Sequence, residues 1–335
     1  MAADKSSPCR IAVYGDLDLV GDALIKLPFV RALRQGFPAA GITWIAGRGK
    51  SAFAGVLAPL VAGLLDRVLE GTGVGARLRA ALGEPRLDLL IDTQSGLATA
   101  WALRKLGARR SVSAAAWGLA GSPPRLDINP SRHLATRLLG VVELITGRPV
   151  GPPGRLALPA EAVALAGRLL PAGPRYVAQV LGAGGKHKAW PEERHVALAR
   201  ALLARGEVPV LILGPDEAAR HAALVAALPD ARFPLQIAQA GGDAASPPLT
   251  IALAMRCAAA VAADCGGGHM MAAAGIPLVS LFGPTDPAKF APSGPGLTIL
   301  RAQDFGLRAQ DFGGAGMAAI PVAAVLAALA ERTDQ

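Results

Sequence analysis

The strongest candidate for chemistry is a run of small residues after a short apolar stretch. Asp264 ends a predicted strand, and Gly266, Gly267, Gly268 and His269 follow at the start of a predicted helix. The first N–H groups of a helix lack partners and carry partial positive charge, and glycine lets a ligand approach the backbone closely. The segment predicts an anion-binding turn, in which His269 could bind a phosphate, cap the loop or pack passively.

A second candidate is the segment from Gly182 to Glu193, which follows a predicted strand at 176–181. Its small residues allow backbone N–H groups to approach a ligand, and Lys186 and Lys188 add positive charge beside them. Pro191 suits the first position of the next helix. We interpret this loop as a phosphate contact rather than as a flexible surface loop.

An acidic residue lies at the end of another predicted strand. Glu217 follows the apolar run 209–214 and could hydrogen-bond the hydroxyl pair of a ribose, as acidic residues do in nucleotide sites. An exposed carboxylate in the first turn of a helix is an equally good interpretation.

Three carboxylates follow the first predicted strand, at 11–14. Asp16 and Asp18 lie in the loop, and Asp22 lies at the start of the helix predicted for 22–34. Asp22 could cap this helix or could act as a general base. If the three are close together, their mutual repulsion should raise at least one pKa.

Predicted strands and helices, which would position these loops, alternate along the whole chain. Short β-branched runs alternate with helical stretches, which predicts parallel sheets covered by helices. A Pro- and Gly-rich segment at 148–159 reads as a linker. We therefore expect two domains, residues 1–150 and 151–335, with the last helix as a candidate to pack back on the first. The expected strands include a short one near Leu235.

Length and composition exclude several classes of protein. The 335 residues are 52% hydrophobic, which rules out a disordered chain. Aromatic residues make up 4%, and the Lys and Arg residues behind the net charge of +9 are scattered, so nucleic-acid binding is not expected.

The sequence also bears on the cellular compartment. Three cysteines without metal-type spacing favour a reducing environment. Neither a signal peptide nor a membrane span is recognisable, since the long uncharged runs are broken by Gly and Pro. We expect a cytoplasmic protein whose basic surface could touch the inner membrane peripherally.

Four motifs in order resemble glycosyltransferase family 9, the heptosyltransferases of lipopolysaccharide core assembly. They are Gly21-Asp22 leading to Leu27-Pro28, Lys188-x-Trp190-Pro191, Asp264-x-Gly266-x-x-His269 and Phe282-Gly-Pro-Thr-Asp-Pro287. The resemblance extends from Ile11 to about Pro292. It implies an α/β chain of GT-B architecture, with two doubly wound, Rossmann-like domains facing across a cleft.

The resemblance also assigns roles. It implies an inverting transferase that needs no metal or cofactor, a nucleotide-sugar donor such as ADP-heptose, and a glycolipid or glycan acceptor. Asp22 corresponds to the family's base, Lys188 to a donor-phosphate contact and Glu217 to the ribose contact. Asp264 and the turn Gly266 to His269 correspond to the donor-binding loop.

Two departures keep alternatives open. The loop before Asp22 is acidic where the family often has a basic residue, so Asp16 and Asp18 stay alternative bases. Cys265 stands where Ser or Thr is common. A nucleotide-sugar epimerase and a non-catalytic sugar-nucleotide-binding protein are the alternative functions.

Overall fold

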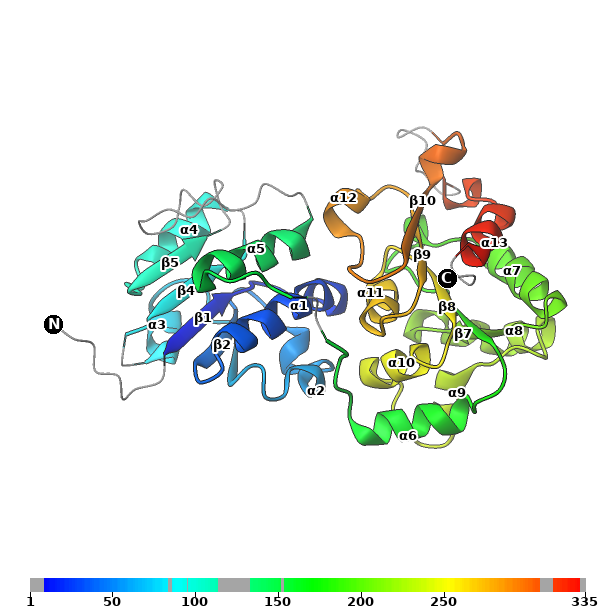
Figure 1. Cartoon of the computed structure of the whole chain (residues 1–335), viewed down its shortest axis with the longest axis horizontal. Coiled ribbons are helices and arrows are strands. Elements are labelled where there is room, and N and C mark those ends of the chain that lie inside the picture. Colours follow the sequence, from blue (N-terminus) through cyan, green and yellow to red (C-terminus); the bar gives the residue numbers. More distant parts are fainter. Residues whose placement is uncertain are drawn as a thin grey trace. The chain divides into compact units, whose positions relative to one another are not determined.

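The computed structural model describes residues 9–83, 86–94, 96–113, 133–151, 154–307 and 316–331. The chain divides into two compact units, residues 1–154 and 155–335. Each unit is built around one parallel five-stranded sheet (Figure 1). The alternation of strands and helices predicted from the sequence is therefore confirmed.

The first sheet has the strand order β3-β2-β1-β4-β5. All its strand pairs are parallel, and β1 pairs with both β2 and β4. Its elements are β1 (Arg10–Tyr14), α1 (Val20–Gly36), β2 (Gly41–Ala46), a 3₁₀ turn η1 (Ala52–Ala54), α2 (Ala58–Val61), β3 (Arg67–Glu70), α3 (Ala76–Leu82), β4 (Leu89–Asp92), α4 (Leu97–Arg104), β5 (Arg110–Ser113) and α5 (Leu134–Thr146).

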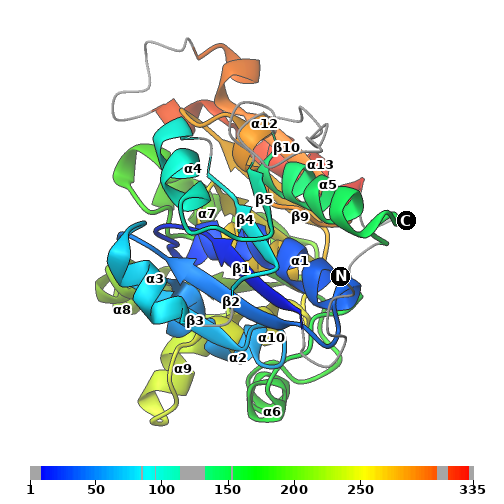
Figure 2. The same ribbon diagram turned by 90° about the vertical axis from the view of Figure 1, so that its left-hand side faces the viewer.

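Alternate residues along the first sheet's strands point to opposite faces, as the period of two requires. On one face, Ala12, Tyr14 and Leu90 pack against Leu78 of α3 and Leu103 of α4. Helices α1 and α5 pack against each other. Figure 2 is seen from the left-hand side of Figure 1, so that this unit faces the viewer, and it shows α3 and α4 as neighbours.

The second sheet has the order β10-β9-β8-β6-β7 and is also parallel throughout. Its elements are α6 (Ala160–Leu169), β6 (Tyr176–Val180), η3 (Lys186–Lys188), α7 (Glu192–Ala204), β7 (Val208–Ile212), η4 (Pro215–Arg220), α8 (His221–Ala227), α9 (Pro234–Ala240), α10 (Pro247–Ala254), β8 (Ala259–Ala263), α11 (Gly266–Ala273), β9 (Leu278–Phe282), α12 (Pro287–Phe290), β10 (Leu297–Arg301), η5 (Ala302–Phe305), η7 (Gly316–Ala319) and α13 (Val322–Ala330).

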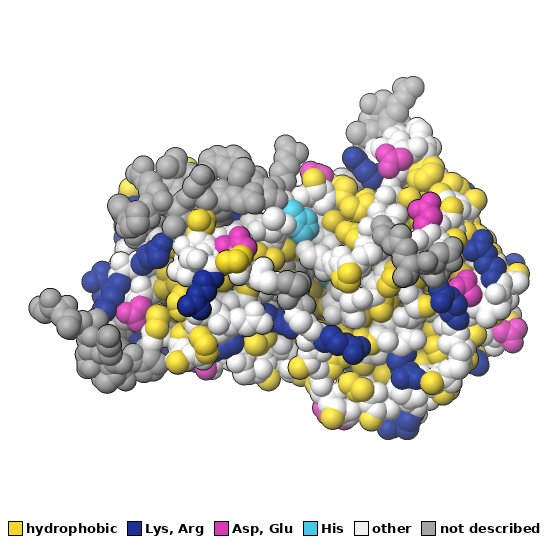
Figure 3. Space-filling view, in the orientation of Figure 1, with side chains coloured by type: hydrophobic (Ala, Val, Ile, Leu, Met, Phe, Trp, Pro, Cys, Tyr) yellow, Lys and Arg dark blue, Asp and Glu magenta, His cyan; other side chains and the backbone are white. Residues whose placement is uncertain are grey.

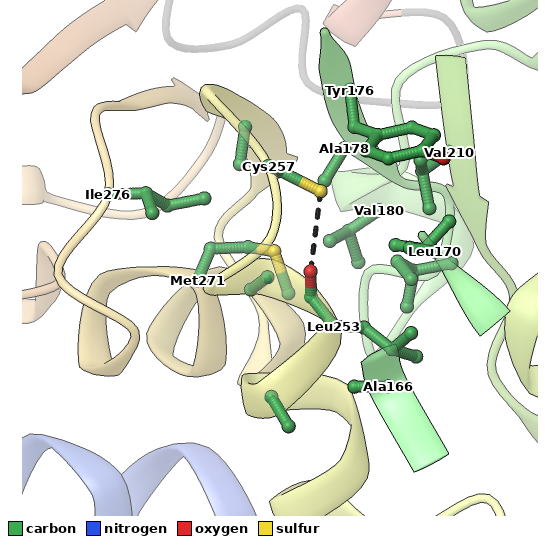
Figure 4. Close-up of a cluster of buried hydrophobic side chains, with 14 of the residues drawn as sticks. Ala166, Leu170, Tyr176, Ala178, Val180, Val210, Leu253, Cys257, Met271 and Ile276 are labelled. Carbon is green, nitrogen blue, oxygen red and sulfur yellow. Dashed lines mark hydrogen bonds between the residues drawn. The ribbon is translucent and has the colours of Figure 1, made fainter. Parts of the chain in front are cut away.

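Both faces of the second sheet are buried. Figure 4 shows one of them, where Ala178 and Val180 of β6 meet Met271 of α11 and Cys257, whose Sγ donates to the Leu253 carbonyl. The opposite face packs against α7 and α13. The double burial explains why these strands read as continuous apolar runs in the sequence.

The prediction of a short strand near Leu235 is wrong, because this residue lies in helix α9. Pro234 occupies the first helical turn, where its missing N–H has no cost, and Leu235 and Ala238 are buried on one side of the helix. Arg232 alone forms a bridge to β7, through Val210.

The last helix packs within its own unit, where α13 contacts α7 and β9. Within the described ranges, no helix is both long and apolar enough to cross a membrane. On the face seen in Figure 3, cationic and anionic side chains are scattered over both units.

Candidate active site

Both sheets reverse their strand order next to their first strand. The reversal lies between β1 and β4 in the first sheet and between β6 and β8 in the second. In open parallel sheets, the loops that leave the carboxyl ends of the strands on either side of such a point form the ligand site. The candidate residues from the sequence follow β1, β6, β7 and β8, so the topology brings them to these two edges.

In the second unit, an ion pair joins the two loops beside the reversal. Lys188 lies in the 3₁₀ turn η3 after β6, and its Nζ donates to Oδ2 of Asp264, which directly follows β8, at 3.0 Å. The Lys188 side chain retains 27% of its exposure and Asp264 retains 11%. The ammonium group is thus held at the sheet edge by a carboxylate, while part of the Lys188 side chain stays exposed to solvent.

The three glycines after Asp264 begin helix α11. Cys265 is the N-cap, and its sulfur accepts from the Gly268 N–H at 3.4 Å. Burial raises the pKa of the Cys265 thiol to about 11, so this cap is neutral at physiological pH. The positive end of the helix dipole is therefore not cancelled by a thiolate.

Packing accounts for two of these glycines. A Cβ on Gly267 would come within 2.5 Å of Val180 Cγ1, and one on Gly268 within 3.1 Å of the Ala263 carbonyl oxygen. The absent side chains therefore let α11 begin close to the carboxyl ends of β6 and β8. His269, in the same first turn, is buried inside the unit.

Glu217 reaches the same edge from the strand on the other side of β6. It lies in η4 after β7 and is buried, and its Oε2 accepts from the Gly214 N–H at 3.1 Å. A Cβ on Gly182, the residue that opens the β6 loop, would lie 2.6 Å from Glu217 Oε2. The structure therefore brings Glu217 beside the loop that carries Lys188, and Gly182 leaves room for its carboxylate.

In the first unit, Asp22 lies in the first turn of α1 and is exposed. Leu19 at the N-cap gives the helix no side-chain cap. Asp22 therefore does not act as the N-cap, and its carboxylate is open to solvent.

Asp18, by contrast, is enclosed. It pairs with Lys26 of α1 and accepts from Trp44 Nε1 at 2.8 Å, and burial raises its pKa against the lowering effect of the Lys26 ammonium. Asp22 adds a smaller increase to this pKa, so the expected mutual repulsion exists, but burial is the main cause.

Asp16 is engaged as well. Arg48 bonds its carboxylate through the side chain and through the backbone N–H, and these bonds lower its pKa. Its backbone adopts φ 60°, a left-handed conformation that Asp tolerates better than most residues. Of the three carboxylates, Asp22 is the one that faces solvent.

Asp92, at the end of β4, was not a candidate in the sequence analysis. Burial raises its pKa to about 6, while it accepts from Ser113 Oγ at 2.8 Å and from the Gln94 N–H at 2.9 Å. Gln94 in turn donates to the Gly15 carbonyl across the strand reversal. The position of an Asp at the end of a predicted strand was the available signal.

Where the structure describes the chain, the side chains that commonly bind metal ions do not gather at one place. Among the described residues, no group of three or more His, Cys, Asp or Glu side chains is placed to hold a metal ion.

Comparisons with known proteins bear on the fold and the family. The family described as "Glycosyltransferase family 9 (heptosyltransferase)" matches residues 75–310, a range that includes the candidates from Lys188 to His269 and excludes Asp22. A comparison with curated proteins gives no match.

Solved structures are similar over almost the whole chain. A family 9 glycosyltransferase from Veillonella parvula has a TM-score of 0.71 at 18% identity, covering 97% of both chains. E. coli ADP-heptose lipopolysaccharide heptosyltransferase II has 0.67 at 19%, covering 97% of this chain and 99% of its own. E. coli heptosyltransferase WaaC, solved with ADP, has 0.67 at 19%, covering 97% and 98%. These likenesses confirm the GT-B fold.

Proposed function

The chain belongs to glycosyltransferase family 9, and on this premise we propose that it transfers a heptose from a nucleotide sugar of the ADP-heptose type to a hydroxyl of a lipopolysaccharide-core or related glycan acceptor. We propose that the transfer inverts the configuration at the anomeric carbon and uses neither a metal ion nor a cofactor. Two solved structures of one relative support the choice of donor, since WaaC was solved with ADP and with ADP-2-deoxy-2-fluoro heptose. We place the protein in the cytoplasm, with peripheral contact to the inner membrane.

One observation carries the donor side of this proposal: the partly exposed Lys188 pairs with Asp264, two residues before the N-terminus of α11. As the bond from the anomeric carbon to the diphosphate oxygen breaks, negative charge grows on the leaving group. Lys188 and the first N–H groups of α11 stabilise this charge where it develops, and such preorganised donors are worth several kcal/mol, roughly 2.7–4 for one group. Glu217 accepts hydrogen bonds from the ribose.

The acceptor side depends on Asp22. Its exposed carboxylate takes the proton of the acceptor hydroxyl as that oxygen attacks the anomeric carbon. The new bond forms on the face opposite the leaving diphosphate, so the configuration inverts. Asp16 and Asp18 are less suited to this role, because each is already bound to a cation of the protein.

The test compares Asp22→Asn with Asp16→Asn in turnover and in donor binding. Asp22→Asn should lower kcat by at least about 100-fold, the usual contribution of a general base, and leave the Kd for ADP within about twofold. Asp16→Asn should retain more activity, provided that it folds. Normal turnover by Asp22→Asn would refute the assignment of the base.

The same assay separates the alternative functions. A donor that changes configuration without any acceptor would indicate an epimerase. A donor that binds but stays intact with every candidate acceptor would indicate a binding protein.

A further inference from the structure

Helix α4 presents large apolar side chains to solvent. Leu97 retains 53% of its exposure and Trp101 retains 62%, and four positions, about one turn, separate them, so they lie on one side of the helix. The adjoining side of α4 buries Ala100 and Leu103, and Leu103 belongs to the apolar cluster on the first sheet. Helix α4 is thus apolar on its packed side and on part of its outer side.

Trp101 differs from the other tryptophans of the described part of the chain. Trp44 and Trp190 are fully buried, and each donates its indole N–H, to Asp18 and to the Ile320 carbonyl. Burying an indole ring is the usual outcome in folding, because its apolar area is large. An outward indole one turn from an outward leucine therefore requires an explanation outside the core.

Cations surround the C-terminal end of α4. Arg104 lies over the Trp101 ring, 5.6 Å from its centroid, and Lys105 beside it is exposed. Arg79 of α3 donates to the Lys105 carbonyl, and Arg86 donates to the carbonyls of the segment that follows. These bonds hold two more guanidinium groups at the corner without neutralising them. Residues 76–110 contain seven Lys or Arg and three Asp or Glu.

We propose that the outer face of α4, namely Leu97, Trp101, Arg104 and Lys105, docks on an anionic lipid bilayer. Indole rings prefer the boundary between headgroups and acyl chains, and lysine and arginine are attracted to anionic headgroups. Two large apolar side chains make only a small apolar patch, whereas a stable protein interface needs about 800 Å² on each partner. The patch therefore fits a lipid surface better than a protein partner. The inference rests on the proposed peripheral membrane contact and not on the transfer reaction.

The test measures co-sedimentation of the full chain with vesicles of phosphatidylcholine alone and of phosphatidylcholine with phosphatidylglycerol. The wild type should bind the anionic vesicles, more weakly as salt rises, and its tryptophan emission should shift to the blue as Trp101 enters the interface. Leu97→Ser with Trp101→Ala, and separately Arg104→Glu with Lys105→Glu, should weaken this binding at least about tenfold.

A matched control comes from the second unit. Ile237 on α9 is also 53% exposed, so Ile237→Ser removes an equally exposed apolar side chain and should leave vesicle binding unchanged. Thermal unfolding of each variant checks that the fold is retained. Binding of ADP, measured without vesicles, should be the same in all of them, which separates this proposal from the donor site.

Three results would overturn the proposal. One is wild-type affinity of the Leu97 and Trp101 double variant for anionic vesicles. Another is equal binding to neutral and anionic vesicles. The third is self-association of the wild type in sedimentation velocity that the double variant abolishes, without vesicle binding, which would assign the face to a second copy of the chain.

Discussion

Replacing Lys188 by Met separates the donor-binding role of this residue from any structural role. The substitution keeps most of the aliphatic chain and removes the ammonium that pairs with Asp264 at 3.0 Å. A partly exposed ion pair of this kind contributes about 0–1 kcal/mol to stability. The thermal midpoint should therefore fall only slightly, by roughly 2–4 °C at most for a chain of this size.

The effect on the donor should be much larger. A hydrogen bond from a charged group to a phosphate oxygen is worth about 1.5–3 kcal/mol, which corresponds to a rise in the Kd for ADP of about 10- to 150-fold. Isothermal titration calorimetry with ADP measures this directly. Lys186→Met is the control, because Lys186 is an exposed lysine in the same turn, and it should change the Kd by less than about threefold.

The variant also leaves Asp264 without its lysine partner, and repulsion between this carboxylate and the diphosphate could account for part of the loss. The double variant with Asp264→Asn removes that repulsion. If Lys188 binds the diphosphate, the double variant stays at least about tenfold weaker than the wild type. A Kd within twofold of the wild type for Lys188→Met, with its thermal midpoint unchanged, would refute the reasoning.

Three other predictions concern Glu217, Asp92 and His195. Gly182→Ala should displace the Glu217 carboxylate, since the new Cβ would lie 2.6 Å from its Oε2. The variant should bind ADP about tenfold more weakly and pyrophosphate as well as the wild type does. Equal losses for both ligands would contradict the assignment of Glu217 to the ribose. Burial raises the pKa of Asp92 from 3.8 to about 6, so its contribution to stability is present below pH 4 and is lost as the pH rises to 6. Asp92→Asn should therefore raise the free energy of unfolding at pH 8, measured with urea, by up to about 3 kcal/mol. A variant less stable than the wild type at that pH would count against this prediction. Burial lowers the pKa of His195, in α7, from 6.5 to about 3, so its contribution to stability is complete above pH 6.5, and the free energy of unfolding should fall by about 2 kcal/mol at pH 5. Urea unfolding of the wild type and of His195→Gln at pH 7 and pH 5 checks this, and the variant should lack the loss. Equal losses in the two proteins would show that another group is responsible.

Much of the fold could be predicted from the sequence because the buried strands are short β-branched or apolar runs between turn signals. The runs at 11–14, 42–46 and 67–70 all become strands of the first sheet. Helix α6 was not predicted, although Ala162, Leu165, Ala166 and Leu169 recur at helical spacing and pack against the core. The helix directly follows the Pro- and Gly-rich segment at 148–159, and the interpretation of that segment as a linker hid the start of the helix.

The candidate site divides in the same way. Motif order could place Lys188 and Asp264 after separate strands, and the strand order then explains why they meet, although they are 76 positions apart. The partners of Asp16 and Asp18 could not be predicted, because Arg48 and Trp44 reach them only through the pairing of β1 with β2. Asp92 was missed because its raised pKa depends on burial, which the residue type does not reveal.

The donor site itself is tested most directly by a crystal structure of the protein with ADP. We expect the diphosphate within hydrogen-bonding distance of Lys188 Nζ and of the backbone N–H groups at the start of α11, with the ribose at Glu217. A diphosphate bound elsewhere on the second unit, while Lys188 and Asp264 remain paired as they are and the first turn of α11 contacts no ligand, would contradict the account.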